Sequence, residues 1–113
     1  MPDRRLAPGD VVWVAPEIAV GREQAGRRPA LVVAGADYLD VVDTLAIVVP
    51  LTTVDRGWPN HVPVEGSALP LESWAMTEQV RTVSRERVVA TAGRVDPQTL
   101  GAVRGWIRDF LEL

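Results

Sequence analysis

The sequence predicts a small α+β domain that is mostly β, with several antiparallel strands followed by one C-terminal helix. Two observations predict it. Short β-branched runs separated by turn residues recur as far as residue 95, and apolar residues with a helical period appear only after that point. With 113 residues, of which 47% are hydrophobic, the chain can bury one core without disulfides, so residues 1–113 are expected to form a single domain.

Six strands are expected in chain order. Each is a β-branched or alternating run bounded by glycine, proline or polar residues. Pro50 indicates an edge or a bulge near the end of the third strand, and the apolar run of the second indicates burial on both faces. The expected ranges are residues 10–15, 30–34, 44–52, 61–66, 75–84 and 86–95, with a loop over residues 21–28.

A helix is expected to follow the last strand. Asp96 is a favourable N-cap residue, and Pro97 suits the first helical position. The apolar residues of this segment recur with a helical period; they are Leu100, Val103, Ile107, Phe110 and Leu111. Their face should cover an open end of the sheet, which gives a small barrel or a strongly curved sheet.

The composition excludes several kinds of site. The chain has no cysteine and one histidine, which excludes thiolate nucleophiles, cysteine zinc sites, two-histidine acid–base pairs and multi-histidine metal sites. The acidic residues are scattered singly, so no metal or other cofactor is expected. The net charge is −3 and every basic residue is arginine, so nucleic-acid binding would need a local arginine cluster. With neither a leader nor a membrane-length apolar run, a cytoplasmic protein without a membrane partner is expected.

The stretch GREQAGRRPALVV, residues 21–33, places two arginines at the entrance of a buried strand. Pro29 fixes its own φ angle and biases Arg28 towards an extended backbone, which makes Arg28 a rigidly held candidate for binding phosphate. The alternative is a solvated loop arginine, or one that pairs with Glu23.

Two further segments carry candidate polar residues. Thr52 and Thr53 end the third strand, where a hydroxyl can bind a ligand but more often caps a turn. In TEQVRT, residues 77–82, an extended backbone would place Glu78 opposite Gln79 and Arg81. Glu78 could act as a base or orient an arginine, or it could be a solvent-facing carboxylate.

The sequence around each tryptophan and around the histidine indicates whether its side chain is exposed or buried. Trp58 lies in a turn-rich loop where it could stack on a base, although burial in a dimer interface is the alternative. Trp13 and Trp106 are expected in the core or at an interface. His61 is expected to be exposed on an edge strand and has no catalytic role assigned.

The segments GDVVWVAP, EQAGRRPALVV, VVPLTT and EQVRT, followed by an amphipathic helix, resemble the MazF/PemK (Kid) toxin family over nearly the whole chain. The resemblance implies an SH3-like antiparallel barrel with a C-terminal helix that works as a homodimer. It implies the toxin of a bacterial toxin–antitoxin pair, which cuts single-stranded messenger RNA at short sequences without metal, using the 2′-hydroxyl as nucleophile. A partly disordered, MazE-like antitoxin would inhibit it across the RNA groove.

Carried over residue by residue, the resemblance implies catalytic roles for Arg28, Thr52 and Glu78. Met76 stands where one branch of the family has an arginine, and the first loop lacks that branch's histidine, so the general acid and base are not carried over. The further residues expected to contact RNA are Glu23, Gln24, Arg27, Thr53, Trp58, Gln79 and Arg81.

A second hypothesis is a protein of the same fold without catalytic activity. It is a non-catalytic dimeric module that acts by binding an antitoxin peptide or another protein, as topoisomerase-binding toxins of the same fold do. The combination of Arg28, Thr52 and Glu78 favours the ribonuclease.

Overall fold

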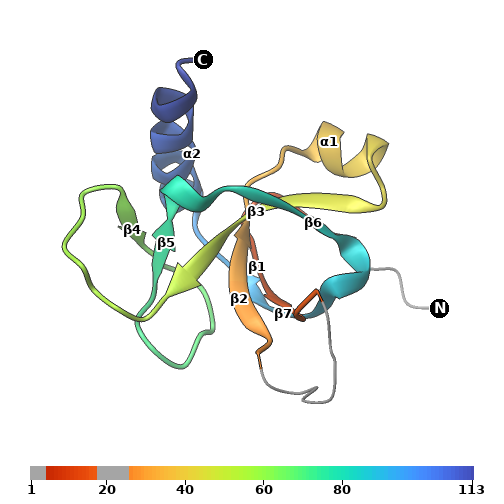
Figure 1. The fold of residues 1–113 in the computed structure, drawn as a ribbon, viewed down its shortest axis with the longest axis horizontal. Helices are drawn as coiled ribbons and strands as arrows, with labels where there is room; N and C mark the ends of the chain where they lie inside the picture. The colour runs from red at the N-terminus through yellow and green to blue at the C-terminus, as the bar shows by residue number, and fades with distance from the viewer. Residues whose placement is uncertain (1–4, 18–25) are drawn as a thin grey trace.

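A computed structural model describes residues 5–17 and 26–113 (Figure 1). Over these residues the chain forms seven strands, two α-helices and two short 3₁₀ turns. The strands are β1 (Asp10–Val14), β2 (Arg28–Val32), β3 (Leu45–Thr52), β4 (His61–Pro63), β5 (Trp74–Met76), β6 (Arg81–Ser84) and β7 (Val88–Arg94). The helices are α1 (Ala36–Val41) and α2 (Pro97–Leu111), and the 3₁₀ turns are η1 (Thr77–Gln79) and η2 (Arg85–Arg87).

The strands form one antiparallel sheet in the order β4-β5-β3-β2-β1-β7, with β6 also paired to β3. The long strand β3 pairs along one edge with β2 and along the other first with β6 and then with β5. Pro50 lies where the partner on this second edge changes from β6 to β5, and its missing N–H therefore removes no bond there. The predicted edge or bulge at Pro50 was wrong: β3 is an interior strand and Pro50 stays in register with Ala30, and the proline is accommodated at the change of partner instead.

The sheet curves strongly but does not close within the described residues. The loop after β4 reaches across to β7, where Ser67 bridges Gly93 and the N–H of Ala68 donates to the carbonyl of Ala92 at 3.0 Å. Gly93 has φ of 95°, and a Cβ there would stand 3.2 Å from the nitrogen of Ala68, so glycine permits this close approach. The predicted mostly antiparallel fold with a C-terminal helix is confirmed, in the form of a curved sheet.

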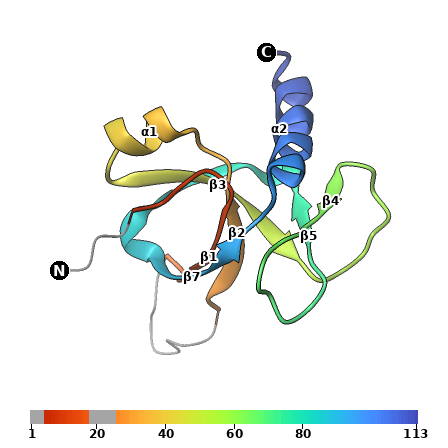
Figure 2. The same cartoon turned by 180° about the vertical axis from the view of Figure 1, so that it is seen from behind.

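Both faces of the central strands are buried. Alternate residues of β1, β2 and β3 point to opposite sides, so that Val12, Val32 and Val48 enter one core and Val11 and Leu31 enter the other. The first core is covered by α1 through Leu39, and the second by α2 through Val103. Figures 1 and 2 show α1 and α2 standing apart on the sheet.

The helix α2 begins as predicted. The Asp96 carboxylate accepts a hydrogen bond of 2.8 Å from the N–H of Thr99, and Pro97 occupies the first turn. The apolar face packs against the second core as far as Ile107, whereas Phe110 is 50% and Leu111 56% exposed. None of the described helices is both long and apolar enough to span a membrane.

One further expectation about local structure was wrong, and one helix was not expected. The segment 75–84 was expected to be one strand, but η1 interrupts it, and the buried Thr77 hydroxyl there donates to the carbonyl of Asn60 at 2.8 Å. The helix α1 was not predicted, because its stability depends on a distant residue. Arg85 donates to the carbonyls of Leu39 and Val42 at its C-terminal end.

Candidate functional site

Arg28 lies where two surface grooves meet. It is the first residue of β2, it is exposed, and it pairs with Val14 across the sheet. We call the first cavity, which Arg28 lines together with Arg81 and Arg87, the arginine groove, and the second, which it lines with Thr52 and Thr53, the threonine groove. Their volumes are about 230 Å³ and 480 Å³, and Pro29 lines both.

The arginine groove has a charged rim over an apolar floor. Its floor includes Val48 and Val83 from the first core. Three guanidinium groups around one small cavity repel one another unless an anion lies between them, and arginine forks match phosphate oxygens. The groove is therefore suited to an anion such as a phosphate group.

Arg87 was missed by the sequence analysis. Its Nε donates to the carbonyl of Ala15 at 2.8 Å, while the N–H of Ala15 donates to the carbonyl of Arg87 at 2.7 Å. These bonds fix Arg87 against the end of β1. The available signal in the sequence was the cluster of Arg81, Arg85 and Arg87 within seven residues.

The threonine groove contains both candidate hydroxyls. Thr52 Oγ1 accepts a hydrogen bond of 3.1 Å from the N–H of Val54, so it caps the turn after β3 as the alternative interpretation expected. A hydroxyl that accepts in this way keeps its own proton to donate. Capping and ligand binding are therefore compatible at Thr52.

Arg27 contacts an aromatic ring beside the grooves. Its guanidinium carbon is 4.9 Å from the ring centre of Trp13, a distance that allows a cation–π contact. Arg27 also lines the threonine groove. Glu23 and Gln24, which were expected to contact RNA, lie outside the described residues.

Glu78 is held by three side chains. Its carboxylate accepts hydrogen bonds from Asn60 Nδ2 at 2.8 Å, from His61 Nε2 at 3.1 Å and from Gln79 Nε2 at 3.4 Å. Gln79 Oε1 in turn accepts from Arg81 Nη2 at 3.3 Å. Glu78 lines neither groove, but Gln79 joins it to an arginine that does.

The surroundings of Glu78 keep it ionised. Partial burial raises the pKa of Glu78, but hydrogen bonds from its own backbone N–H and from His61, together with the His61 charge, act more strongly in sum, so the pKa lies below the ordinary value of 4.5. The carboxylate is therefore charged at neutral pH. That state accepts the donors around it and cannot supply a proton.

His61 was expected to be exposed, and this was wrong. It is 6% exposed, its ring centre lies 4.8 Å from that of Trp58, and its Nδ1 has no hydrogen-bond partner among the described residues. An unpartnered buried nitrogen costs about 1–3 kcal/mol. The simple alternation of residues 61–66 could not show that Glu78 would meet this ring.

Trp58 is 49% exposed, so part of its ring is accessible for stacking. The guanidinium carbon of Arg56 lies 5.8 Å from its ring centre. Trp106, the other tryptophan assigned to a core or interface, packs partly buried against the second core. This exposure in the single chain is compatible with both interpretations of Trp58, stacking on a base and burial in a dimer interface.

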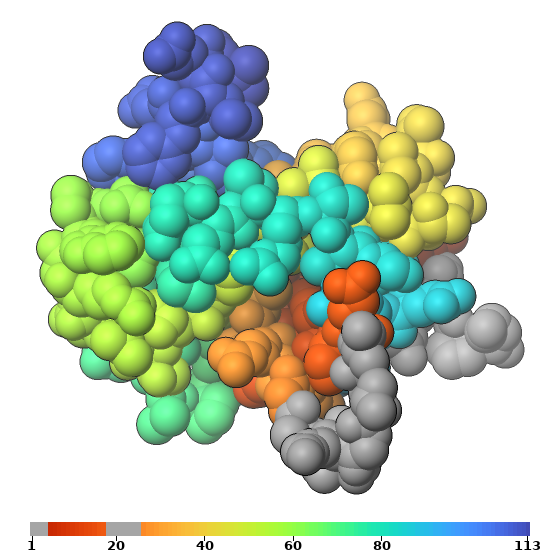
Figure 3. Space-filling view, in the orientation of Figure 1, coloured from red at the N-terminus to blue at the C-terminus, as the bar shows by residue number. Residues whose placement is uncertain are grey.

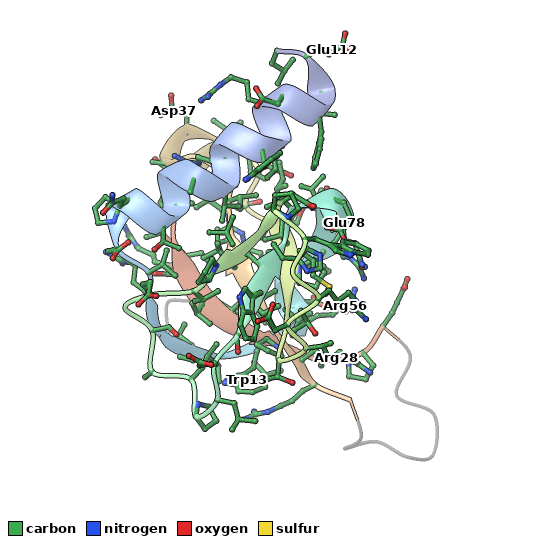
Figure 4. All side chains as sticks on the ribbon, turned by 90° about the vertical axis from the view of Figure 1, so that its left-hand side faces the viewer. Trp13, Arg28, Asp37, Arg56, Glu78 and Glu112 are labelled. Carbon is green, nitrogen blue, oxygen red and sulfur yellow. The ribbon has the colours of Figure 1, made fainter. Side chains whose placement is uncertain are left out.

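The candidate residues gather on one face. Figure 4 shows Glu78, Arg56 and Arg28 following one another along the same side of the molecule. In Figure 3 this face is turned to the viewer, and the start of β2, in orange, stands at the edge of a hollow below the teal surface. Among the described residues there is no group of three side chains able to hold a metal ion.

Comparison with known proteins gives the family. The family model of the PemK-like, MazF-like toxin of type II toxin–antitoxin systems matches residues 7–111. The endoribonuclease toxin MazF of Escherichia coli (strain K12) is 32% identical over 100 residues, which cover 88% of this chain and 87% of the relative.

Solved structures share the fold. A MazE–MazF crystal structure from Deinococcus radiodurans superposes with a TM-score of 0.81 at 28% identity, covering 98% of this chain and 99% of that one. A MazF crystal structure from the same organism gives 0.78 at 28% identity, covering 98% and 100%. The family model spans nearly the whole chain, and the chain therefore belongs to the PemK-like, MazF-like toxins of type II toxin–antitoxin systems.

Proposed function

We propose that this protein is a toxin that cuts single-stranded messenger RNA in the cytoplasm, without a metal ion. The endoribonuclease name of relatives at 32% identity supports the activity. The observation that carries the proposal is the position of Arg28, which lines both the arginine groove and the threonine groove. An arginine that lines both grooves, with hydroxyl groups beside it in one of them, suits the phosphate groups of RNA.

The proposed reaction uses the 2′-hydroxyl of the RNA as nucleophile. Its oxygen attacks the adjacent phosphorus, the bond from phosphorus to the 5′-oxygen breaks, and the products are a 2′,3′-cyclic phosphate and a 5′-hydroxyl. The 2′-oxygen loses a proton and the 5′-oxygen gains one. This route needs neither cysteine nor paired histidines, and the chain has no cysteine and a single histidine.

Arg28 would stabilise the charge that develops on the phosphorane oxygens. Arginine remains charged at any working pH, and its planar donors fit two oxygens at once. The rigid extended backbone before Pro29 limits how far this group can move. Thr52 would orient the scissile phosphate by donating its hydroxyl proton, while Arg81 and Arg87 would bind neighbouring phosphates in the arginine groove.

Glu78 had two possible roles, as a base or as a residue that orients an arginine. Its contacts favour the second. The carboxylate already accepts from Asn60, His61 and Gln79, and Gln79 binds Arg81. We therefore propose that Glu78 acts on the RNA site through Gln79 and Arg81.

The proposed partners are a second copy of the chain and an antitoxin. Solved relatives include MazE–MazF complexes, which supports an antitoxin that covers the grooves around Arg28. Exposed apolar residues at the end of α2 and just after it, Phe110, Leu111 and Leu113, support a homodimer that buries them. A stable monomer in sedimentation at micromolar concentration would contradict the dimer.

The test is cleavage of a long mixed-sequence RNA by the purified protein, with and without EDTA. Defined fragments of equal yield in both conditions are expected. The absence of fragments in either condition, together with tight antitoxin binding, would favour the binding module instead. A strict requirement for magnesium would contradict the metal-free reaction.

A further inference from the structure

A histidine at position 61 is unfavourable for the stability of the fold. It begins β4, it is 6% exposed, and one of its two ring nitrogens is buried without a hydrogen-bond partner among the described residues. An apolar side chain of similar volume would leave no polar atom unpaired. A buried polar residue that stability alone would not select needs another explanation.

The protonation of the ring follows from its partner. Glu78 is ionised and can only accept, so the hydrogen bonds to its two oxygens, at 3.1 and 3.2 Å, require a proton on His61 Nε2. Nδ1 is then the ring nitrogen left without a hydrogen-bond partner among the described residues. The ring is also covered by Trp58 at 4.8 Å between centres, which leaves it little freedom to turn.

From Glu78, side-chain hydrogen bonds continue to the arginine groove. Gln79 uses both ends of its amide, donating to Glu78 at 3.4 Å and accepting from Arg81 at 3.3 Å. A flipped amide would turn its NH₂ group towards the Arg81 donors, so the carboxylate selects the orientation that Arg81 needs. Arg81 lines the same groove as Arg28.

We propose that His61 is a positioning residue of the RNA site: it holds Glu78 in place and, through Gln79, aims Arg81 into the arginine groove. This rests on the proposed function for its effect on RNA. The two bonds of Gln79 are long for hydrogen bonds between side chains. The effect on cleavage is therefore expected to be moderate, about tenfold.

Two substitutions separate positioning from folding. His61→Leu removes the donor and the unpaired nitrogen while filling the space. The lost bond to Glu78 and the removed unpaired atom act on stability in opposite directions, so the protein should stay folded and yet cut RNA about tenfold more slowly in kcat/KM. His61→Gln keeps an N–H donor near the position of Nε2, and it should recover most of the rate. Thr99→Val is the matched control, because it removes a buried hydroxyl in the first turn of α2, outside both grooves.

A second readout does not depend on RNA cleavage. The carboxyl carbon of Glu78 can be titrated by NMR with ¹³C-labelled glutamate, and the pKa of Glu78 should rise in His61→Leu and stay low in Thr99→Val. If the wild type cuts no RNA, the proposed function fails, and this titration still decides whether His61 holds the carboxylate. An unchanged Glu78 titration, wild-type cleavage by a folded His61→Leu, or His61→Gln as slow as His61→Leu would each overturn the proposal.

Discussion

Two hydrogen bonds join Arg87 to Ala15. The Arg87 side chain donates to the Ala15 carbonyl at 2.8 Å, and the Ala15 N–H donates to the Arg87 carbonyl at 2.7 Å. The second bond is made by the backbone and survives any substitution at residue 87. The first ties a groove arginine to the end of β1, so Arg87 links the arginine groove to the fold.

Replacing Arg87 should therefore affect both RNA affinity and stability. Arg87→Ala is expected to raise KM for RNA and to lower stability by about 1 kcal/mol, the usual loss for one hydrogen bond. Arg87→Lys keeps the positive charge and loses the planar guanidinium, so its KM should lie between those of the wild type and Arg87→Ala. RNA binding at several salt concentrations measures the affinity, and urea unfolding measures the stability. Equal KM values for the wild type and both variants would show that Arg87 does not contact RNA.

Thr52 should tolerate serine better than alanine. Thr52→Ala removes both the acceptor for the Val54 N–H and the hydroxyl proton that faces the groove, whereas Thr52→Ser keeps both. Thr52→Ala is expected to cut RNA about tenfold more slowly, less than the loss for a charged donor. Single-turnover rates of the two variants check this, and a serine variant as slow as the alanine variant would contradict it.

The stability of the protein should fall in acid. Burial raises the pKa of Glu78, but hydrogen bonds and the His61 charge lower it by more in sum, so that the pKa lies below 4.5. The pKa of Asp96 lies below 3.8, chiefly because of hydrogen bonds from the Thr99 side chain and backbone. A lowered pKa in the folded state gives stability that is present above the unfolded value and lost as pH falls through the folded one.

Urea unfolding from pH 7 down to pH 3 measures this dependence. The free energy of unfolding should be flat near neutrality and decline as the pH drops below 4.5, the ordinary value for Glu78. Glu78→Gln should remove the upper part of the decline and leave the part that belongs to Asp96. A profile identical to that of the wild type would mean that Glu78 does not couple to folding.

The fold was largely predictable because its signals are local. The Pro-Gly turn before β1, the apolar runs of β2 and β3 and the Asp-Pro start of α2 each depend on neighbouring residues. The helix α1 was missed because Arg85, more than 40 residues away, satisfies its last carbonyls. Its short sequence carries no cap of its own, since Gly35 makes no side-chain bond.

The site was only partly predictable for a related reason. Arg28 and Thr52 were identified as candidates from their places at strand ends, but their meeting depends on the register that pairs Ala30 with Pro50. The burial of His61 depends on a contact with Glu78, 17 residues later, after an unpredicted 3₁₀ turn. Contacts between distant segments leave no periodic signal in the sequence.

The substrate requirement and the product ends identify the nucleophile of the cleavage reaction. Attack by the 2′-hydroxyl requires that a substrate with 2′-deoxyribose at the cut site resist cleavage entirely, and that the products carry a 2′,3′-cyclic phosphate and a 5′-hydroxyl. End-labelling and mass spectrometry of the fragments check this. A 5′-phosphate end would show that water or another nucleophile attacks instead.

The most direct test is the single-turnover rate of Arg28→Ala on a mapped RNA site, beside Arg27→Ala. Removing one transition-state donor should slow cleavage by about 10²–10³, while the exposed position of Arg28 predicts a change in stability below about 0.5 kcal/mol. Arg27→Ala should keep most of the rate and lose the contact with Trp13. A folded Arg28→Ala that cuts RNA at nearly the wild-type rate would contradict the central role of Arg28 between the two grooves.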